Sequence, residues 1–190
     1  MSALEACANA AAPDLSPTAR VILGMITFGK RTGYDIKAFV DKSTRHFWAA
    51  SYGQIYPELR RLEQQGLVRG RPEPTGGRAR TVYELTNAGH AALKQWLQDA
   101  EEPLYELRDE GMLKLFFSDV APQLRPELVH ALKARQERKL AQLRAIEDHA
   151  KQGPPGPYLT LRLGLAQTEA FIDWCAEAER ELAAPDKREP

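Results

Sequence analysis

The 190-residue sequence contains little cysteine, and its two cysteines exclude the usual cysteine chemistry. Cys7 and Cys175 lie far apart along the chain, at a spacing that suits neither a metal site nor a redox motif. So low a cysteine content is typical of a reducing compartment, and we expect a cytoplasmic protein.

Long hydrophobic runs are also absent. No apolar run approaches the roughly 18 residues that a membrane-spanning helix needs, so we expect no membrane segment. The first 14 residues contain no Lys or Arg and only a weak apolar stretch, which argues against a signal peptide. Residues 1–14 are expected to form a loose N-terminal arm, and residues 184–190 a short tail.

The residue types that catalysis needs do not form any recognisable set. The four histidines are not at metal-ligand spacing, and the glycines do not form a nucleotide-binding loop. No Ser/His/Asp or Cys/His arrangement is present in the sequence. We therefore expect neither an enzyme nor a protein with a bound metal or cofactor.

The net charge of zero hides an uneven distribution of charge. Residues 15–98 contain 13 Lys and Arg against 6 Asp and Glu, whereas residues 99–190 contain 13 against 18. A basic half joined to an acidic half indicates that one half meets a polyanion such as nucleic acid. The alternative is an accidental scatter of charge along the chain.

Two helices are predicted at the start of the ordered chain. Ser16 is a good N-cap that precedes a proline, and apolar residues at helical spacing continue from there to Phe28. A second helix is expected from Tyr34 to about Phe47 or Trp48, with its apolar residues turned inward.

A third helix is predicted between Ser51, a capping residue, and Gly66, a typical helix end. Ile55, Leu59 and Leu62 recur on one stripe of this helix, and this stripe must face a core. The opposite side then presents its polar groups to solvent.

Two short strands follow, at residues 67–71 and 81–86, joined by a segment rich in Gly, Pro and Arg. Thr86 caps a fourth helix, whose apolar positions run from Ala88 to Leu97. Three helices with a two-stranded wing form a winged helix-turn-helix, in which the third helix enters the DNA major groove. The expected fold class is therefore mainly α with a small β-hairpin wing, and we assign this DNA-binding domain to residues 15–100.

Beyond Glu101–Pro103 the sequence predicts an α-helical domain at residues 104–183, with helices near residues 109–118, 122–151 and 158–182. The two long helices carry apolar stripes that the short helix cannot cover, and pairing with a second copy would bury them. We interpret this region as a dimerisation domain, which would make the operator an inverted repeat with half-sites about 10 bp apart. The alternative is that these helices pack back on the winged domain.

The first turn of the third helix is a candidate for DNA contact. Phosphate or base edges can be bound there by the backbone amides and by the side chains of Ser51, Tyr52, Gln54 and Tyr56. Further along the helix, Arg60 adds positive charge. In the alternative interpretation the two tyrosines complete the core, and the arginines of this helix pair with its glutamates.

The loop between the two strands adds a second candidate contact. It carries Arg78 and Arg80 at its tip, and guanidinium groups suit phosphate and the narrow minor groove. The alternative is an ordinary solvated hairpin.

These motifs resemble the PadR family of transcriptional regulators. The resemblance rests on GYDI at residues 33–36, SYGQIYPELRRLEQQGLV at residues 51–68 and GGRARTVYELTNAGHAAL at residues 76–93. Residues 158–183 are similar to the last helix of the longer members. The resemblance implies a homodimeric winged-helix repressor whose C-terminal helices dimerise it, and whose DNA complex is loosened by a small aromatic or amphipathic effector.

The resemblance also assigns site residues, position by position. On the recognition helix it selects Ser51, Gln54, Tyr56 and Arg60. On the wing tip it selects Gly76, Gly77, Arg78 and Arg80. At the first helix–helix turn we add Lys30 and Arg31 as contacts to the DNA backbone.

Trp96 and Trp174 are candidates for the effector site, because some family members stack planar ligands on an aromatic residue near the dimer interface. The alternative for each is packing in a core or an interface. The function expected is thus a sequence-specific DNA-binding regulator, a repressor released by a small molecule. The competing hypothesis is a winged-helix interaction module whose basic face binds an acidic protein.

Overall fold

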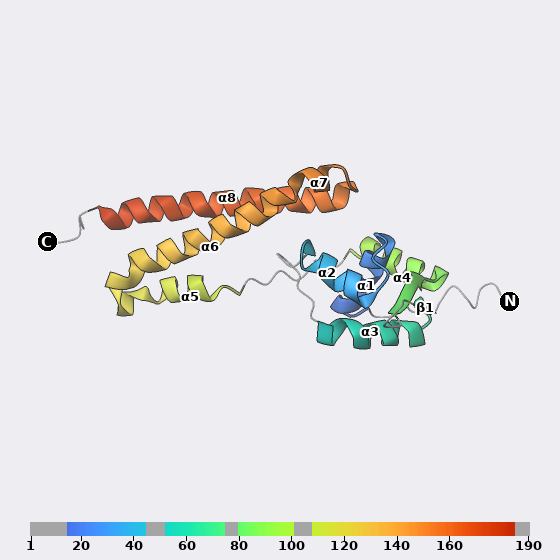
Figure 1. Cartoon of the computed structure of the whole chain (residues 1–190). Helices are drawn as coiled ribbons and strands as arrows, with labels where there is room; N and C mark the ends of the chain where they lie inside the picture. The colour runs from blue at the N-terminus through green and yellow to red at the C-terminus, as the bar shows by residue number, and fades with distance from the viewer. Residues whose placement is uncertain (1–14, 45–51, 75–79, 101–107, 185–190) are drawn as a thin grey trace. The chain divides into compact units, whose positions relative to one another are not determined.

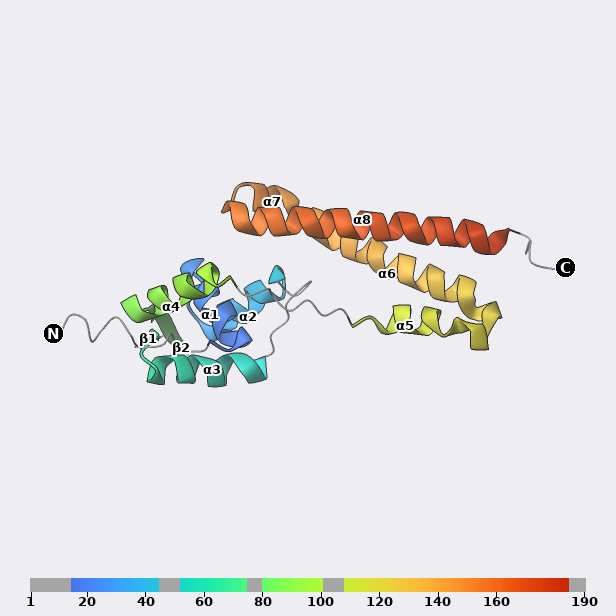
Figure 2. The same cartoon turned by 180° about the vertical axis from the view of Figure 1, so that it is seen from behind.

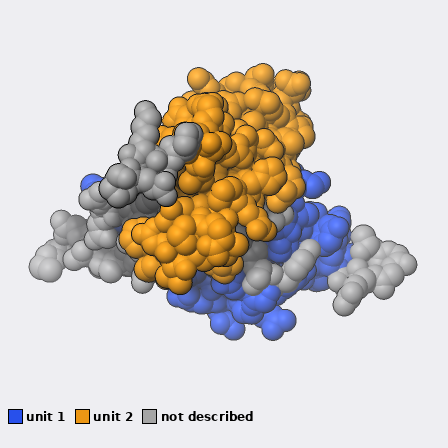
Figure 3. Space-filling model, turned by 90° about the vertical axis from the view of Figure 1, so that its left-hand side faces the viewer, with its two compact units in different colours: residues 1–103 blue, residues 104–190 orange. Residues whose placement is uncertain are grey.

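The computed structural model describes residues 15–44, 52–74, 80–100 and 108–184. The chain divides into two compact units, one within residues 1–103 and the other within residues 104–190, coloured separately in Figure 3. Each unit has hydrophobic cores of its own, formed by residues of that unit alone.

Within the described residues, the first unit contains four α-helices and a two-stranded antiparallel hairpin (Figure 1). In chain order they are α1 (Pro17–Thr27), α2 (Gly33–Val40), α3 (Tyr52–Gln64), β1 (Val68–Glu73), β2 (Arg80–Leu85) and α4 (Asn87–Gln98). The core lies where α1, α2 and α3 meet, and it includes Ile22, Ile36 and Leu59, none of which is exposed.

Side-chain caps start three of these helices, as the sequence indicates for α1 and α4. The hydroxyl of Ser16 accepts the amide of Ala19 at 3.1 Å, and Thr86 accepts that of Gly89 at 3.1 Å. Thr32 caps α2 in the same way. Each cap satisfies a backbone donor that the helix itself leaves unpaired.

Gly66 ends α3 and turns the chain into β1. Its φ of +70° is in the left-handed region, which glycine adopts without strain. The amide of Leu67 then donates back to the carbonyl of Leu62 at 2.9 Å. This tight turn places β1 directly after α3.

The predicted end of the second helix is wrong. Helix α2 ends at Val40 instead of continuing to Phe47 or Trp48, which lie outside the described residues. Its buried stripe is complete at Val40, and the hydroxyl of Ser43 then bonds the carbonyl of Phe39 at 2.7 Å, a local bond that competes with helix continuation.

The predicted strand bounds are shifted as well: β1 covers Val68–Glu73 instead of residues 67–71, and β2 covers Arg80–Leu85 instead of residues 81–86. Pro72 is tolerated there because β1 is an edge strand of a two-stranded sheet.

Two of the apolar positions noted in the pattern of the fourth helix are exposed. Trp96 and Leu97 at the end of α4 are 37% and 70% exposed, whereas Ala92 and Leu93 one turn earlier are buried. Phe28, just beyond the end of α1, is also exposed. The apolar pattern predicts more buried residues than the structure contains, because the first unit is too small to cover the whole apolar stripe of each helix.

In its described residues, 108–184, the second unit is built of helices. It contains α5 (Glu110–Phe116), two short 3-10 turns η2 (Ser118–Val120) and η3 (Pro122–Leu124), α6 (Arg125–Ala145), α7 (Glu147–Lys151) and α8 (Pro155–Ala183). Helix α8 runs antiparallel beside α6 and α7, as the two opposite views in Figures 1 and 2 show. Two small cores lie between these helices, one around Val129 and Cys175 and the other around Leu143 and Leu165.

The helix predicted at residues 122–151 is divided in the structure. Residues 122–124 form a 3-10 turn, and the helix is interrupted at Ile146 before α7. Helix α8 instead begins three residues earlier than predicted, at Pro155, because proline fits the first position of a helix. No helix in the described part of the chain is long and apolar enough to cross a membrane.

Asp109 joins α5 to α6 in the second unit. Its Oδ1 accepts the amides of Gly111 at 2.9 Å and Met112 at 3.3 Å, and the carboxylate pairs with the guanidinium of Arg135. The hydrogen bond from Arg135 is the main reason why the pKa of Asp109 is lowered, and the two backbone amides add to it.

Asp109→Asn is expected to destabilise the protein by about 1 kcal/mol at pH 7, because the amide keeps the cap and loses the charged pair. A carboxyl with a lowered folded-state pKa contributes stability above its unfolded pKa, and this contribution disappears as the pH falls through the folded pKa. The difference between variant and wild type should therefore be smaller at pH 3 than at pH 7. Urea unfolding followed by circular dichroism at pH 7 and pH 3 measures it.

Asp173→Asn, on the exposed side of α8, is the matched control and should change stability little at either pH. If Asp109→Asn lowers the free energy of unfolding equally at pH 7 and pH 3, the ion pair of Asp109 with Arg135 does not contribute to stability.

Candidate nucleic-acid interface

Helix α3 turns one side to the core and the other to solvent. Ile55, Leu59 and Leu62 are fully buried, as the stripe in the sequence predicts. Gln54 and Arg60 lie on other faces of the helix and are exposed. These two predicted contact residues are therefore accessible to a ligand. Ser51 and the side chain of Tyr52, also predicted as contacts, lie outside the described part of the structure.

Glu58 attaches α3 to the start of α1. The hydroxyl of Ser16 donates to Oε1 of Glu58 at 2.6 Å, so one serine both caps α1 and binds α3. Arg61 donates to the same oxygen at 3.3 Å. The pairing of Arg61 with Glu58, an alternative left open by the sequence, is present. Arg60 makes no ion pair with another described residue, so its charge is available to a ligand.

Tyr56 has a structural contact as well as an exposed surface. A β-carbon added at Gly33 would lie 2.6 Å from Cε1 of the Tyr56 ring, so the ring packs directly on the backbone of the first residue of α2. The residue is nevertheless 44% exposed. Tyr56 thus sets the spacing of α2 and α3 and still presents part of its surface to solvent.

The hairpin is bonded to the loop between α1 and α2. The amide of Tyr83 in β2 donates to the carbonyl of Arg31 at 2.7 Å, and the hydroxyl of Thr86 donates to the carbonyl of Gly66 at 2.6 Å. The wing, the first helix–helix turn and the end of α3 are therefore parts of one framework.

The cations predicted at the first helix–helix turn have partners inside the unit. Nζ of Lys30 lies 4.9 Å from the centroid of the Phe39 ring, and Arg31 donates to Glu84 at 3.2 Å. Exposed pairs of this kind contribute about 0–1 kcal/mol, so a phosphate can replace the carboxylate at low cost.

Arg80, predicted at the wing tip, donates across the hairpin to Glu73 at 2.7 Å and has an exposed side chain. Gly76, Gly77 and Arg78, the other residues predicted there, lie outside the described residues. Arg69 and Arg71 of β1 are also exposed, although they were not among the predicted contacts. The alternation of a strand puts them on the face opposite Val68, a signal that was present in the sequence.

The two tryptophans predicted for an effector site belong to different units. Trp96 stacks under the guanidinium of Arg20, whose Cζ lies 5.5 Å from the ring centroid, and Trp174 packs edge-on against Phe171 at 5.5 Å. Both are more than one-third exposed. The neighbours of Trp96 and Trp174 are therefore those expected for ordinary side-chain packing, the alternative that the sequence left open.

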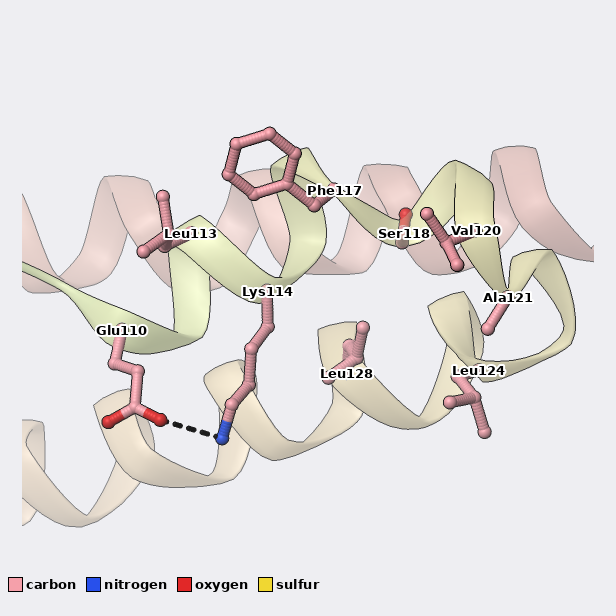
Figure 4. Close-up of a pocket in the computed structure, with 9 residues that line it drawn as sticks. All are labelled: Glu110, Leu113, Lys114, Phe117, Ser118, Val120, Ala121, Leu124 and Leu128. Atoms are coloured by element: carbon pink, nitrogen blue, oxygen red, sulfur yellow. Dashed lines mark ion pairs between the residues drawn. The ribbon is translucent and has the colours of Figure 1, made fainter.

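An apolar groove of about 470 Å³ opens between α5 and the start of α6 (Figure 4). The ion pair of Glu110 and Lys114 lies at one end, and Val120 and Leu124 lie at the other. Val120 is 92% exposed, and Phe116 and Phe117 nearby are 79% and 60% exposed. Neither Trp96 nor Trp174 lines this groove.

No cluster of three or more His, Cys, Asp or Glu within the described residues could hold a metal ion.

Two family models match the chain, one in each unit. The model of the transcriptional regulator PadR-like family matches residues 22–95, and that of the virulence activator alpha C-terminal region matches residues 107–183. The negative transcriptional regulator PadR of Bacillus subtilis is 31% identical over 178 residues, which cover 87% of this chain and 96% of that protein. The chain belongs to the PadR-like family of transcriptional regulators. The resemblance noted in its motifs is confirmed, and the protein is a regulator rather than an enzyme.

Solved structures of relatives extend over both units. The crystal structure of Bacillus subtilis PadR in complex with operator DNA has a TM-score of 0.80 at 26% identity, covering 89% of this chain and 99% of that one. The structure of the Vibrio cholerae virulence activator AphA has a TM-score of 0.64 at 30% identity, covering 87% and 97%. The predicted fold class, a winged helix-turn-helix followed by a helical region, is confirmed.

Gly33→Ala is expected to destabilise the first unit by about 1–3 kcal/mol, because the new methyl group collides with the ring of Tyr56 and must displace it. Thermal unfolding measures the loss. Gly24→Ala in α1 is the matched control, since a β-carbon there meets nothing within 4 Å, and it should leave stability unchanged or raise it. Equal effects of the two substitutions would show that Tyr56 does not pack on Gly33 in solution.

Proposed function

We propose that this protein is a sequence-specific DNA-binding repressor in which α3 reads the major groove and the β1–β2 wing contacts the backbone. The observation that carries the proposal is the orientation of α3, whose apolar stripe is fully buried while Gln54 and Arg60 are exposed. Exposed amide and guanidinium groups on a helix are suited to base edges and phosphates.

The names of the relatives bear on two parts of this proposal, DNA binding and repression. The Bacillus subtilis relative is named a negative transcriptional regulator, and its structure was determined with operator DNA. The Vibrio cholerae relative is named an activator, so the sign of regulation needs a direct assay. Transcription from a promoter that contains the bound site should fall when the protein is added. A rise would contradict repression and leave DNA binding intact.

Within α3 we propose that Gln54 and Tyr56 contact bases or phosphates near the start of the helix and that Arg60 contacts phosphate. Ser51 and Tyr52 keep their proposed roles at the helix start, where the backbone amides of α3 favour an anion. On the wing and its supporting turn, the proposed contacts are Lys30, Arg31, Gly76, Gly77, Arg78 and Arg80. We add Arg69 and Arg71 to this group because both are exposed on one face of β1.

We propose that residues 15–100 form the DNA-binding domain and residues 104–183 a dimerisation domain, with residues 1–14 as an arm and residues 184–190 as a tail. The groove between α5 and α6, with Phe116 and Val120 exposed beside it, supports pairing with a second copy. Contiguous apolar surface of this kind is typical of an interface. Two copies then present two α3 helices to an inverted repeat.

A small aromatic or amphipathic effector that releases the DNA remains part of the proposal, as the family resemblance implies. Trp96 and Trp174 are retained as candidates for its site because both rings are partly exposed. A repressor of this kind would act on chromosomal DNA in the cytoplasm.

The competing function, a module whose basic face binds an acidic protein, uses the same charges. Sequence preference separates the two hypotheses. A DNA reader discriminates its operator from scrambled DNA of the same length, whereas a basic face that serves an acidic protein binds both equally and releases both with salt.

Gln54→Ala is expected to cost about 1–3 kcal/mol of binding to the operator and less on scrambled DNA, because a lost base contact affects only the specific complex. Fluorescence anisotropy with both DNAs measures the two losses. Gln98→Ala, an exposed glutamine at the end of α4, is the control and should leave both affinities unchanged. Equal losses on the two DNAs would assign Gln54 to a phosphate.

Val120→Asp is expected to convert the dimer to a monomer and to weaken operator binding, because it places a charge on apolar surface that the second copy would cover. Light scattering after size-exclusion chromatography measures the molar mass. Leu97→Asp, at a similarly exposed leucine in the first unit, should leave the mass unchanged. A Val120→Asp variant with the mass of a dimer would remove this surface from the interface.

A further inference from the structure

We propose that Glu63, at the end of α3, is a positioning residue that holds the wing in register with the recognition helix. The inference rests on the proposed DNA-binding function. Its structural basis is a hydrogen bond of 2.9 Å from the amide of Gly70 in β1 to Oε1 of Glu63. A side chain of α3 is thereby bonded to the backbone of the wing.

The pairing of the strands explains why this bond is needed. Gly70 lies opposite Tyr83 in the antiparallel register, and the amide of Tyr83 donates away from β1, to the carbonyl of Arg31. In antiparallel sheets the two residues of such a pair both point their backbone groups outward. The amide of Gly70 therefore points away from β2, on the side of α3, and Glu63 supplies its acceptor.

The side chains around the hydrogen bond between Gly70 and Glu63 are also closely packed. A β-carbon at Gly70 would lie 2.8 Å from Oε1 of Glu63, 2.9 Å from Cγ2 of Thr81 and 3.0 Å from Cε1 of Tyr83. The absence of a side chain at Gly70 lets the carboxylate approach the backbone of β1 without displacing these neighbouring side chains. The pKa of Tyr83 is raised first by burial and then by the charge of Glu63, which agrees with the carboxylate lying near this ring.

The position of Glu63 explains how the bond would affect DNA recognition. A helix in the major groove and a wing on the backbone must fit the same duplex at once, so the angle between them has to be fixed beforehand. On the other side, the wing is held by the bond between Tyr83 and Arg31. Glu63 is the residue of α3 whose side chain bonds the backbone of β1, in addition to the bond from Thr86 to Gly66 at the end of the helix.

Electrostatics alone predicts the opposite effect of removing Glu63. A carboxylate near a DNA-binding surface repels phosphate, so removal of its charge should strengthen binding to any DNA. Glu63→Gln removes this charge and keeps a carbonyl oxygen as acceptor, whereas Glu63→Ala removes both. The two variants therefore separate a positioning role from a charge effect.

The first test measures the hydrogen bond without DNA. Amide hydrogen exchange of the full-length protein should be faster at Gly70 in Glu63→Ala than in wild type, and close to wild type in Glu63→Gln. Gln65→Ala changes an exposed neighbour in the same turn and should leave the exchange at Gly70 unchanged. Unchanged exchange in Glu63→Ala would overturn the proposal.

The second test measures DNA binding of the same variants by anisotropy, on the operator and on scrambled DNA. Glu63→Ala should lose about tenfold in affinity for the operator, the factor that one ordinary hydrogen bond provides. Its salt dependence on the operator should also become shallower, because phosphate contacts of the wing are lost. Glu63→Gln should retain the wild-type affinity or exceed it.

The outcomes distinguish this inference from the proposed function. A wild-type protein that does not discriminate operator from scrambled DNA would contradict the function itself. If the wild type discriminates and Glu63→Ala binds the operator as well as Glu63→Gln does, the positioning role is wrong and the function stands. Thermal unfolding of both variants confirms that each is folded, as expected for a bond at the solvent-exposed side of the hairpin.

Discussion

The burial of Ile55, Leu59 and Leu62 is the constraint on which the rest of the first unit depends. Complete burial of such a side chain contributes about 1.5–3 kcal/mol, so the three together fix the rotation of α3 about its axis. A shift by one residue would turn the stripe by about 100° and expose it. With the rotation fixed, Gln54 and Arg60 must face solvent, and Glu58 and Glu63 each reach a neighbouring element.

Two glutamates of α3 then hold the neighbouring elements around it. Glu58 receives the hydroxyl of Ser16 at the start of α1, and Glu63 receives the amide of Gly70 in the wing. The ring of Tyr56 packs on Gly33 and sets the distance to α2. The recognition surface that we propose is therefore held by contacts along α3 from Tyr56 to Glu63, before any ligand is present.

Much of the fold could be predicted from the sequence because it depends on local signals. Ser16 and Thr86 cap helices as expected, and the stripe of α3 is buried as expected. The end of α2 and the interruption at Ile146 could not be predicted, because the apolar pattern continues past both points and local bonds decide where the helix stops. The links from Ser16 to Glu58 and from Tyr83 to Arg31 join residues far apart in sequence, and such tertiary contacts leave no local pattern.

The most direct test of the central claim is a selection of random double-stranded DNA by the full-length protein, followed by sequencing. We predict enrichment of an inverted repeat whose half-sites are about 10 bp apart, one turn of DNA, because a symmetric pair of α3 helices would read it. Retention of DNA without any enriched sequence would contradict sequence-specific binding and favour a basic surface that serves a protein partner.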